Sequence, residues 1–218
     1  ESAASSVLAD YNVPLSFARQ LKHEQAYAVW SPALSHVSRI LRLLGGQPTA
    51  CVDASRQFLL DMIDTQVTAL GLEAKAGDDH LKKLLRARLA GAAVVHGHPA
   101  TVEEAKGIFA NATRMAGLGP DEQSTVLKAV VRWGTEADFA EVKRRYLAAT
   151  FAAEKKRLMY ALAAARATKL IDEVLNMAIG EAVRAQDTVS LLAAVARYDE
   201  GRSRAFTFIQ QNWKLLDA

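Results

Sequence analysis

Apolar residues recur at intervals of three and four along most of the chain, with polar residues between them. This period places the apolar side chains on one face of a helix, which buries that face against its neighbours. No segment alternates convincingly with a period of two, so we expect no strands. Between residues 101 and 146 the pattern predicts three successive helices, whose apolar positions are Ala105, Ile108, Phe109 and Ala112, then Val126, Leu127, Val130 and Val131, and then Phe139, Val142 and Tyr146.

Local signals mark where these three helices begin and end. The stretch from Thr101 to Glu104 reads Thr-Val-Glu-Glu, a capping box in which the hydroxyl and the carboxylate satisfy free backbone amides. The first helix is expected to stop at Gly117, and Gly119-Pro120-Asp121 begins the second, which runs up to Gly134. Thr135 is the expected cap of the third helix.

Further helices are expected on both sides of this region. Near the start of the chain, Ser31-Pro32 can cap a helix running to Leu44, or Pro32 can lie in the first turn of a helix that begins near Tyr27. The other expected helices cover residues 50–70, 80–95, 152–165, 169–178, 188–196 and 202–216.

The fold class that these elements predict is all-α. The expected helices are near the usual length of about 10 to 14 residues, and their short connections favour antiparallel pairs stacked as an α-solenoid. The repeat is degenerate and HEAT-like, because tetratricopeptide and ankyrin signatures are absent from the sequence. A compact helical bundle is the alternative, although roughly a dozen short helices exceed what one bundle core usually needs. We expect residues 1–218 to form a single helical-repeat domain.

The composition allows a sizeable core and narrows the range of partners. Half of the 218 residues are hydrophobic, and the formal charge is only +3, with basic and acidic residues interleaved, which argues against nucleic acid. The basic run at 155–157 is most simply a solvated helix face.

No apolar run approaches the roughly 18 residues of a membrane span, and no signal peptide is visible. The one cysteine, Cys51, excludes an internal disulfide and favours a reducing, cytoplasmic compartment. Because the chain begins at Glu1 without Met, we expect a fragment or a processed product.

No complete catalytic motif is found in the sequence. His23-Glu24 begins like the helix of a zinc protease, but the second imidazole would have to stand at Tyr27. His96 and His98 flank an expected turn, and two histidines are too few for a closed metal site. We therefore predict no catalytic residue, no metal site and no cofactor in this chain. Tested alone, it is expected to bind no stoichiometric zinc and to hydrolyse no aminoacyl reporter substrate.

The last part of the chain combines a polar cluster with an aromatic stripe. Arg184, Gln186 and Asp187 lie together just before an expected helix, where Asp187 is well placed to act as the cap. Because an aromatic stripe at helical spacing is usually core, we expect the stripe that follows to seal the end of the solenoid. Its members are Phe206, Phe208, Ile209 and Trp213.

Four stretches of the chain, taken together, resemble the C-terminal part of zinc aminopeptidases of the gluzincin class, particularly the puromycin-sensitive type. They follow in the order of that family from about Val7 to Leu216. Leu72 departs from the pattern, since Trp is usual at that position. The four stretches read EQAYAVWSPALSHVSRI, LGLEAKAGDDHLKKLLRARL, VRAQDTVSLLAAVA and GRSRAFTFIQQNWKLL.

This resemblance implies a non-catalytic C-terminal domain of a larger zinc metalloaminopeptidase, an enzyme that removes N-terminal residues from peptides. Zn²⁺ is then expected in the missing catalytic domain, because none of the zinc-binding motifs of that domain stands in this chain. In the family, the helical domain is a curved HEAT-like array that covers the catalytic cavity and helps to select peptides by length. The implied partners are the chain's own upstream catalytic domain and peptide substrates, with no nucleic acid and no membrane.

For the polar cluster, the resemblance implies a place near the mouth of that cavity. Gln186 is then a candidate for substrate binding, and Arg184 either steers peptide carboxylates or pairs with Glu181. An exposed Gln186 without a function stays open as the alternative.

Two other functions stay open for the whole chain. One is a stand-alone helical-repeat adaptor that binds a protein or peptide on its concave face. The other is a basic RNA-binding solenoid, against which the interleaved charges argue.

Overall fold

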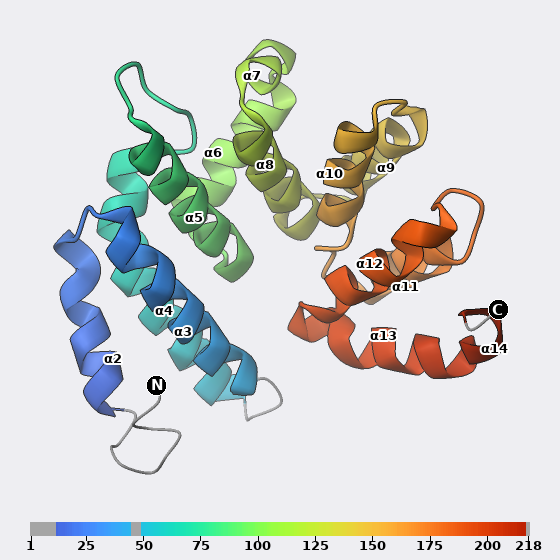
Figure 1. The fold of residues 1–218 in the computed structure, drawn as a ribbon, viewed down its shortest axis with the longest axis horizontal. Helices are drawn as coiled ribbons and strands as arrows, with labels where there is room; N and C mark the ends of the chain where they lie inside the picture. Colours follow the sequence, from blue (N-terminus) through green and yellow to red (C-terminus); the bar gives the residue numbers. More distant parts are fainter. Residues whose placement is uncertain (1–11, 45–48, 217–218) are drawn as a thin grey trace. The chain divides into compact units, whose positions relative to one another are not determined.

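The structure is a computed structural model, and it describes residues 12–44 and 49–216 of the chain (Figure 1). Every regular element in these residues is helical, which confirms the predicted all-α class. Of the described helices, none combines the length and the hydrophobicity needed to cross a membrane. Residues 7–11, where the family resemblance begins, lie outside the described part. The helices are α2 (Asn12–Ala18), the 3-10 helix η1 (Arg19–His23), α3 (Tyr27–Leu43), α4 (Thr49–Leu70), α5 (His80–His96), α6 (Pro99–Ala110), α7 (Ala112–Gly117), α8 (Pro120–Trp133), α9 (Glu136–Ala148), α10 (Ala152–Leu162), α11 (Thr168–Ala178), α12 (Ala185–Ala196), α13 (Asp199–Gln211) and α14 (Trp213–Leu216).

The chain divides into two compact units, and the division falls within α6, α7 and α8. Unit 1 comprises Glu1–Gly107 and Ala116–Thr125, and unit 2 comprises Ile108–Met115 and Val126–Ala218. Each unit buries apolar side chains of its own, such as Leu59 in unit 1 and Val142 in unit 2.

Unit 1 is built on three long helices that pack against one another. The helices α3 and α5 have 17 residues each and α4 has 22, so the expectation of uniformly short helices is wrong here. The predicted ranges 50–70 and 80–95 are nevertheless confirmed to within a residue at each end. Of the two alternatives near the start of the chain, the helix that begins at Tyr27 is the right one, although Pro32 lies in its second turn and not in its first. The core includes Trp30, Leu34, Leu59, Ile63 and Leu89.

The loop between α4 and α5 carries the family-like stretch that follows Leu70. Gly71 and Gly77 have positive φ angles of 66° and 89°, a backbone conformation that glycine adopts without the clash of a Cβ atom. The backbone N–H of Leu72 donates to Oε1 of Glu104 at 3.2 Å. Glu104 therefore holds this loop, and that contact lies within unit 1.

The capping box predicted at Thr101 is wrong, because α6 begins two residues earlier, at Pro99. Proline suits the first helical position, where its fixed φ is helical and its missing N–H is not needed. His98 supplies the cap instead. Its Nδ1 accepts from the backbone N–H of Thr101 at 3.4 Å and lies 2.8 Å from the Thr101 hydroxyl. Its Nε2 lies 2.9 Å from Oδ1 of Asp64.

The other predicted helix ends in this region agree better with the structure. The first helix is interrupted at Asn111, whose Oδ1 accepts from the N–H of Arg114 at 3.0 Å and starts the short α7. The restart at Pro120 is confirmed. The cap at Thr135 is confirmed too, and its partner in the capping box is Asp138.

Unit 2 consists of helix pairs that stack side by side (Figure 1). α9 packs against α10, α11 against α12, and α12 against α13, while α10 also contacts α12 and α11 contacts α13. Ion pairs also link helices of this unit. Lys143 of α9 pairs with Glu173 of α11, and Asp172 of α11 pairs with Arg204 of α13. Within this unit, the arrangement is the stacking of short helix pairs that the sequence predicted.

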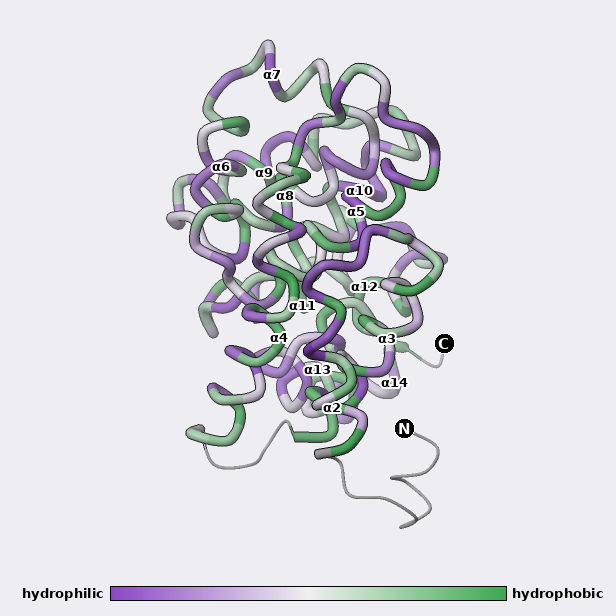
Figure 2. Tube along the Cα trace, turned by 90° about the vertical axis from the view of Figure 1, so that its left-hand side faces the viewer, coloured by the Kyte–Doolittle hydropathy of each residue, from purple (hydrophilic) through white to green (hydrophobic). Residues whose placement is uncertain are grey.

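The aromatic stripe near the end of the chain is not buried: Phe206 and Trp213 are exposed, and Phe208 and Ile209 are only partly buried. The prediction that this stripe seals a core is therefore wrong. The helix expected over 202–216 is divided into α13 and α14 at Asn212, and Trp213 begins the second part. Trp213 is 55% exposed and Phe206 is 64% exposed. Polar and apolar residues are interspersed along the helices (Figure 2). This pattern alone does not show which apolar helix face packs against a neighbouring helix.

Because Trp213 is exposed, replacing it by Ala should barely change the stability of this chain. We expect Trp213→Ala to lower the free energy of unfolding by less than about 1 kcal/mol, as for other surface substitutions. Urea denaturation followed by circular dichroism measures this value. A loss of about 3 kcal/mol or more, typical of a buried Trp, would mean that the side chain is packed in solution.

Candidate functional site

The polar cluster identified in the sequence lies at the start of α12, in unit 2. The helix begins at Ala185, three residues earlier than predicted, so Asp187 stands in its first turn and not at its cap. The cap prediction for Asp187 is therefore wrong, and no side chain caps this helix start. The reason is that Arg184 already has the extended backbone of a cap residue, while Ala185 and Gln186 favour helix. A carboxylate in the first turn still interacts favourably with the helix dipole.

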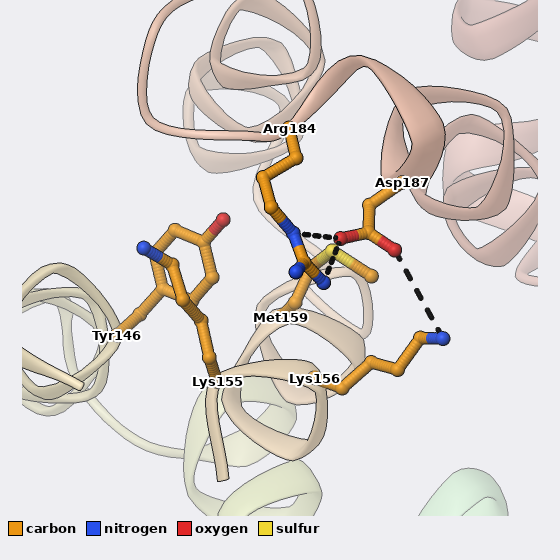
Figure 3. A pocket seen from close by; sticks show the side chains of 6 residues that line it. All are labelled: Tyr146, Lys155, Lys156, Met159, Arg184 and Asp187. Carbon is orange, nitrogen blue, oxygen red and sulfur yellow. Dashed lines mark hydrogen bonds and ion pairs between the residues drawn. The ribbon is translucent and has the colours of Figure 1, made fainter. Parts of the chain in front are cut away.

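Asp187 is buried and binds Arg184 (Figure 3). Its Oδ2 accepts a hydrogen bond from Nε of Arg184 at 2.8 Å and lies 2.7 Å from Nη2 of the same side chain. Its Oδ1 lies 3.9 Å from Nζ of Lys156, a distance too long for a hydrogen bond. Arg184 thus pairs with Asp187 and not with Glu181, the partner considered from the sequence.

Tyr146 and Lys155 line the opposite side of the same small cavity (Figure 3). The Tyr146 hydroxyl donates to the carbonyl oxygen of Ala182 at 2.8 Å. Burial, and then the negative charge of Asp187, raise the pKa of this hydroxyl, so it stays protonated and keeps donating. Nζ of Lys155 lies 5.2 Å from the centre of the Tyr146 ring, a cation–π contact. Among the described residues, no carboxylate lies within ion-pair distance of Lys155.

The cluster carries more positive than negative charge. Three cations, Lys155, Lys156 and Arg184, line the cavity together with a single carboxylate, that of Asp187. The enclosed volume is only about 10 Å³, with Met159 as its apolar side. This is close to the smallest space that holds one water molecule. The arrangement can therefore attract an anionic group and admit one of its oxygen atoms, but it cannot enclose a whole ligand.

Gln186 is exposed, and in the described part of the chain its carboxamide has no hydrogen-bond partner. The structure thus places Gln186 next to the cluster, on the solvent side. Sequence reasoning found Arg184, Gln186 and Asp187 but missed Tyr146, Lys155 and Lys156, and it interpreted 155–157 as a plain solvated face. Those three residues lie on α9 and α10, and no spacing along the chain indicates that they meet the start of α12.

The donor groups of the described residues do not fit a zinc ion. No three His, Cys, Asp or Glu side chains in residues 12–44 and 49–216 lie together as metal ligands would. Both ring nitrogens of His98 are engaged, one by Thr101 and the other by Asp64. Cys51 is a free, exposed cysteine. No chemical step is therefore assigned to zinc in this chain.

Comparison with known proteins gives one family and a consistent set of relatives. Residues 2–218 match the family model described as the ERAP1-like C-terminal domain. The chain is similar to Aminopeptidase M1-A of Oryza sativa subsp. japonica, with 26% identity over 201 residues that cover 89% of this chain. It is also similar to Aminopeptidase M1 of Arabidopsis thaliana, with 24% identity over 93% of this chain. A third relative is the glutamyl aminopeptidase of Sus scrofa, with 24% identity over 98% of this chain.

These relatives are much longer than the chain. The matched region makes up 23% of the length of each of the three proteins named above. The chain therefore spans less than a quarter of the curated relatives that it matches.

Proposed function

The chain belongs to the ERAP1-like C-terminal domain family, and on that premise we propose that it is the non-catalytic C-terminal domain of a zinc metalloaminopeptidase. The resemblance seen in the sequence is confirmed at the level of this family, whose match covers residues 2–218. The match carries the proposal, together with relatives that are named as aminopeptidases and extend far beyond the matched region. In the proposed enzyme, catalysis and Zn²⁺ belong to the remainder of the protein.

We propose that the domain covers the catalytic cavity, contributes to peptide binding and helps to select peptides by length. Two observations support this role. Exposed apolar side chains on α13 and α14, among them Phe206, Trp213 and Leu215, are typical of a domain that packs against another part of its protein. The second observation is the cation-rich cluster beside Gln186 at the start of α12, which offers polar groups to a peptide.

The proposed partners are the upstream catalytic domain of the same protein and peptide substrates. We place the proposed enzyme in the cytoplasm, because the sequence contains a single cysteine, Cys51, and its exposed thiol suits a reducing compartment. We also keep residues 1–218 as one structural domain in this proposal, since one family model covers both compact units.

One alternative is a stand-alone helical-repeat adaptor that binds a protein or peptide. The reading frame upstream of this chain separates the two functions. A zinc metalloaminopeptidase requires His-Glu-x-x-His followed by a distal Glu in that frame, because two imidazoles and a carboxylate hold the catalytic zinc. An upstream frame without these ligands would exclude the proposed enzyme and leave the adaptor.

Gln186 provides a test of peptide binding in the full-length protein. We expect Gln186→Ala to lower kcat/KM for peptides about two- to tenfold, the effect of losing one hydrogen bond. For a minimal aminoacyl reporter, which does not extend to this surface, we expect no change. The free energy of unfolding should stay within about 0.5 kcal/mol of the wild type, because the side chain is exposed.

The matched control is Gln210→Ala, which removes an exposed carboxamide from α13. It should leave the kinetics of both kinds of substrate unchanged. If Gln186→Ala has equal effects on peptides and on the reporter, Gln186 makes no contact with the peptide.

A further inference from the structure

We propose that two copies of this chain bind each other through a groove between α9 and α11, as a dimer with two-fold symmetry. The α9–α11 groove is lined by side chains between Glu136 and Leu147 on α9 and between Lys169 and Glu173 on α11. It lies within unit 2 and shares no lining residue with the cluster at the start of α12. The dimer goes beyond the function proposed above, which assigns no second copy.

The α9–α11 groove is large enough to receive side chains of another protein. Its volume is about 340 Å³, and it opens to solvent. Phe139 and Leu170 are buried and form an apolar floor, while Ala140 and Leu147 line the groove and are exposed. Because apolar surface in an open groove gains stability when it leaves water, this face favours a protein partner over solvent.

Two ion pairs cross the groove and show that α9 and α11 run in the same direction. Nζ of Lys169 lies 3.2 Å from Oε2 of Glu136, and both residues stand in the first turn of their helices. Nζ of Lys143 lies 2.5 Å from Oε1 of Glu173, further along both helices. Each helix therefore contributes one charge of each sign to these pairs, and the order of the signs is opposite on the two helices.

This charge pattern is complementary to itself. In a two-fold dimer the same patch of both copies forms the interface, so that residue i contacts residue j and j contacts i. With the axis directed across the two helices, Glu136 faces Lys143 of the second copy, and Lys169 faces Glu173 of the second copy. Each of these facing pairs joins opposite charges, which fixes the register of the two copies.

The axis lies across the helices because this direction sets each helix antiparallel to its counterpart. Antiparallel helices place the positive end of one helix dipole near the negative end of the other, whereas an axis along the helices would make them parallel. Arg144, the remaining charged residue that lines the groove, is already paired with Glu141 of its own helix. It therefore leaves the order of the four facing charges intact.

The centre of the groove is apolar and lies between its charged ends. Ala140 stands midway between Glu136 and Lys143, about 5 Å along the helix axis from each. Its small, exposed side chain lets the two copies of α9 approach closely. The apolar centre of one copy thus meets that of the other on the axis, and the charges surround it, as in protein interfaces that have an apolar core and a polar rim.

The experiment measures the mass of the full-length protein by sedimentation equilibrium. We expect the wild type to have twice the mass of one chain. Glu136→Lys and Lys143→Glu should each raise the Kd of the dimer about tenfold or more, because symmetry makes every substitution create two contacts between like charges. Glu154→Lys on α10 makes the same change of charge at an exposed residue outside the groove, and it should leave the Kd unchanged. Circular dichroism shows that each variant is folded.

Mixing the two weakened variants separates contacts between copies from contacts within one copy. In a dimer of Glu136→Lys with Lys143→Glu, opposite charges face each other at both contacts, so the mixture should recover the Kd of the wild type. The broken ion pairs with Lys169 and Glu173 inside each copy stay broken, and they cannot account for the recovery. Glu136→Lys mixed with Lys169→Glu should not recover, because these two positions do not face each other across the axis.

Three results would overturn the proposal. These are a wild-type protein that stays monomeric, a dimer whose Kd neither charge reversal changes, and two weakened variants that do not recover on mixing. The second result would place the dimer contact on another face, and the third would attribute the effects to ion pairs within one copy. All three are measured as mass, so the outcome is independent of whether the protein is the proposed enzyme.

Discussion

Replacing Trp30 by Ala should lower the free energy of unfolding by about 3 to 5 kcal/mol, the range measured for deleting a buried Trp or Phe side chain. Trp30 is fully buried in the core of unit 1. Its indole Nε1–H also donates to the carbonyl oxygen of Glu24 at 2.8 Å, so the substitution leaves this carbonyl without its partner. The cavity and the lost hydrogen bond act in the same direction.

The comparison with Trp213→Ala makes this prediction specific. Both substitutions delete the same side chain, but Trp30 is 0% and Trp213 is 55% exposed. Urea denaturation of the two variants and the wild type should therefore show one large loss and one small loss. Similar losses for both variants would mean that burial in the structure does not describe the chain in solution.

Replacing Arg86 by Met should lower the free energy of unfolding by about 3 kcal/mol, at the lower end of the range for breaking a buried ion pair. The Arg86 side chain is 2% exposed, and its Nε donates to the carbonyl oxygen of Leu70 at 3.2 Å. Its Nη2 lies 2.6 Å from Oδ2 of Asp78. This contact lacks the geometry of a hydrogen bond and is an ion pair. The electrostatic attraction between the two charges is strong because they lie so close together.

Lys83→Met is the matched control, because Lys83 lies on the same helix but is exposed. Its unfolding free energy should change by no more than about 0.5 kcal/mol. If Arg86→Met is equally harmless, the buried ion pair contributes nothing to stability.

The ion pair also predicts how the effect of Arg86→Met depends on pH. A hydrogen bond from the backbone N–H of Lys75, and then the polar contacts with the Lys82 and Arg86 side chains, hold the pKa of Asp78 well below its usual value. A lowered pKa in the folded state stabilises the protein above the unfolded pKa of about 3.9, and this contribution is lost as the pH falls below that value. The difference between wild type and Arg86→Met should therefore be largest at neutral pH and should narrow below about pH 4. Urea denaturation at pH 7 and pH 3 measures it.

Much of the helical structure could be predicted because its signals are local. The cap at Thr135, the restart at Pro120 and the ranges of α4, α5 and α11 each depend on residues within a few positions of one another. The prediction failed where a second signal close by in the sequence determined the start of the helix. Thr101 is followed by a suitable Glu, but Pro99 and the His98 ring start α6 earlier, and the Glu104 carboxylate binds Leu72 instead.

The candidate site could be predicted only in the part that is contiguous in the sequence. Arg184, Gln186 and Asp187 stand together in the chain, and their residue types indicate polar contacts. Lys155 and Tyr146 reach the same cavity from α10 and α9. Residues some 30 positions apart meet only through the packing of helices, and an interleaved charge pattern is equally compatible with solvated lysines.

The sequence by itself determined the all-α class, most helix boundaries, the absence of a complete catalytic motif, and the family resemblance that the comparison then confirmed. These properties depend on the helical period, on caps and on short ordered motifs, which act over a few residues. The tertiary structure decided which apolar faces are covered, so that Trp30 is core while Trp213 is exposed. It also decided which charges meet, as Arg184 with Asp187 and Arg86 with Asp78. Burial and ion pairing depend on what lies across a helix interface, and the period of one helix carries no information about its neighbour.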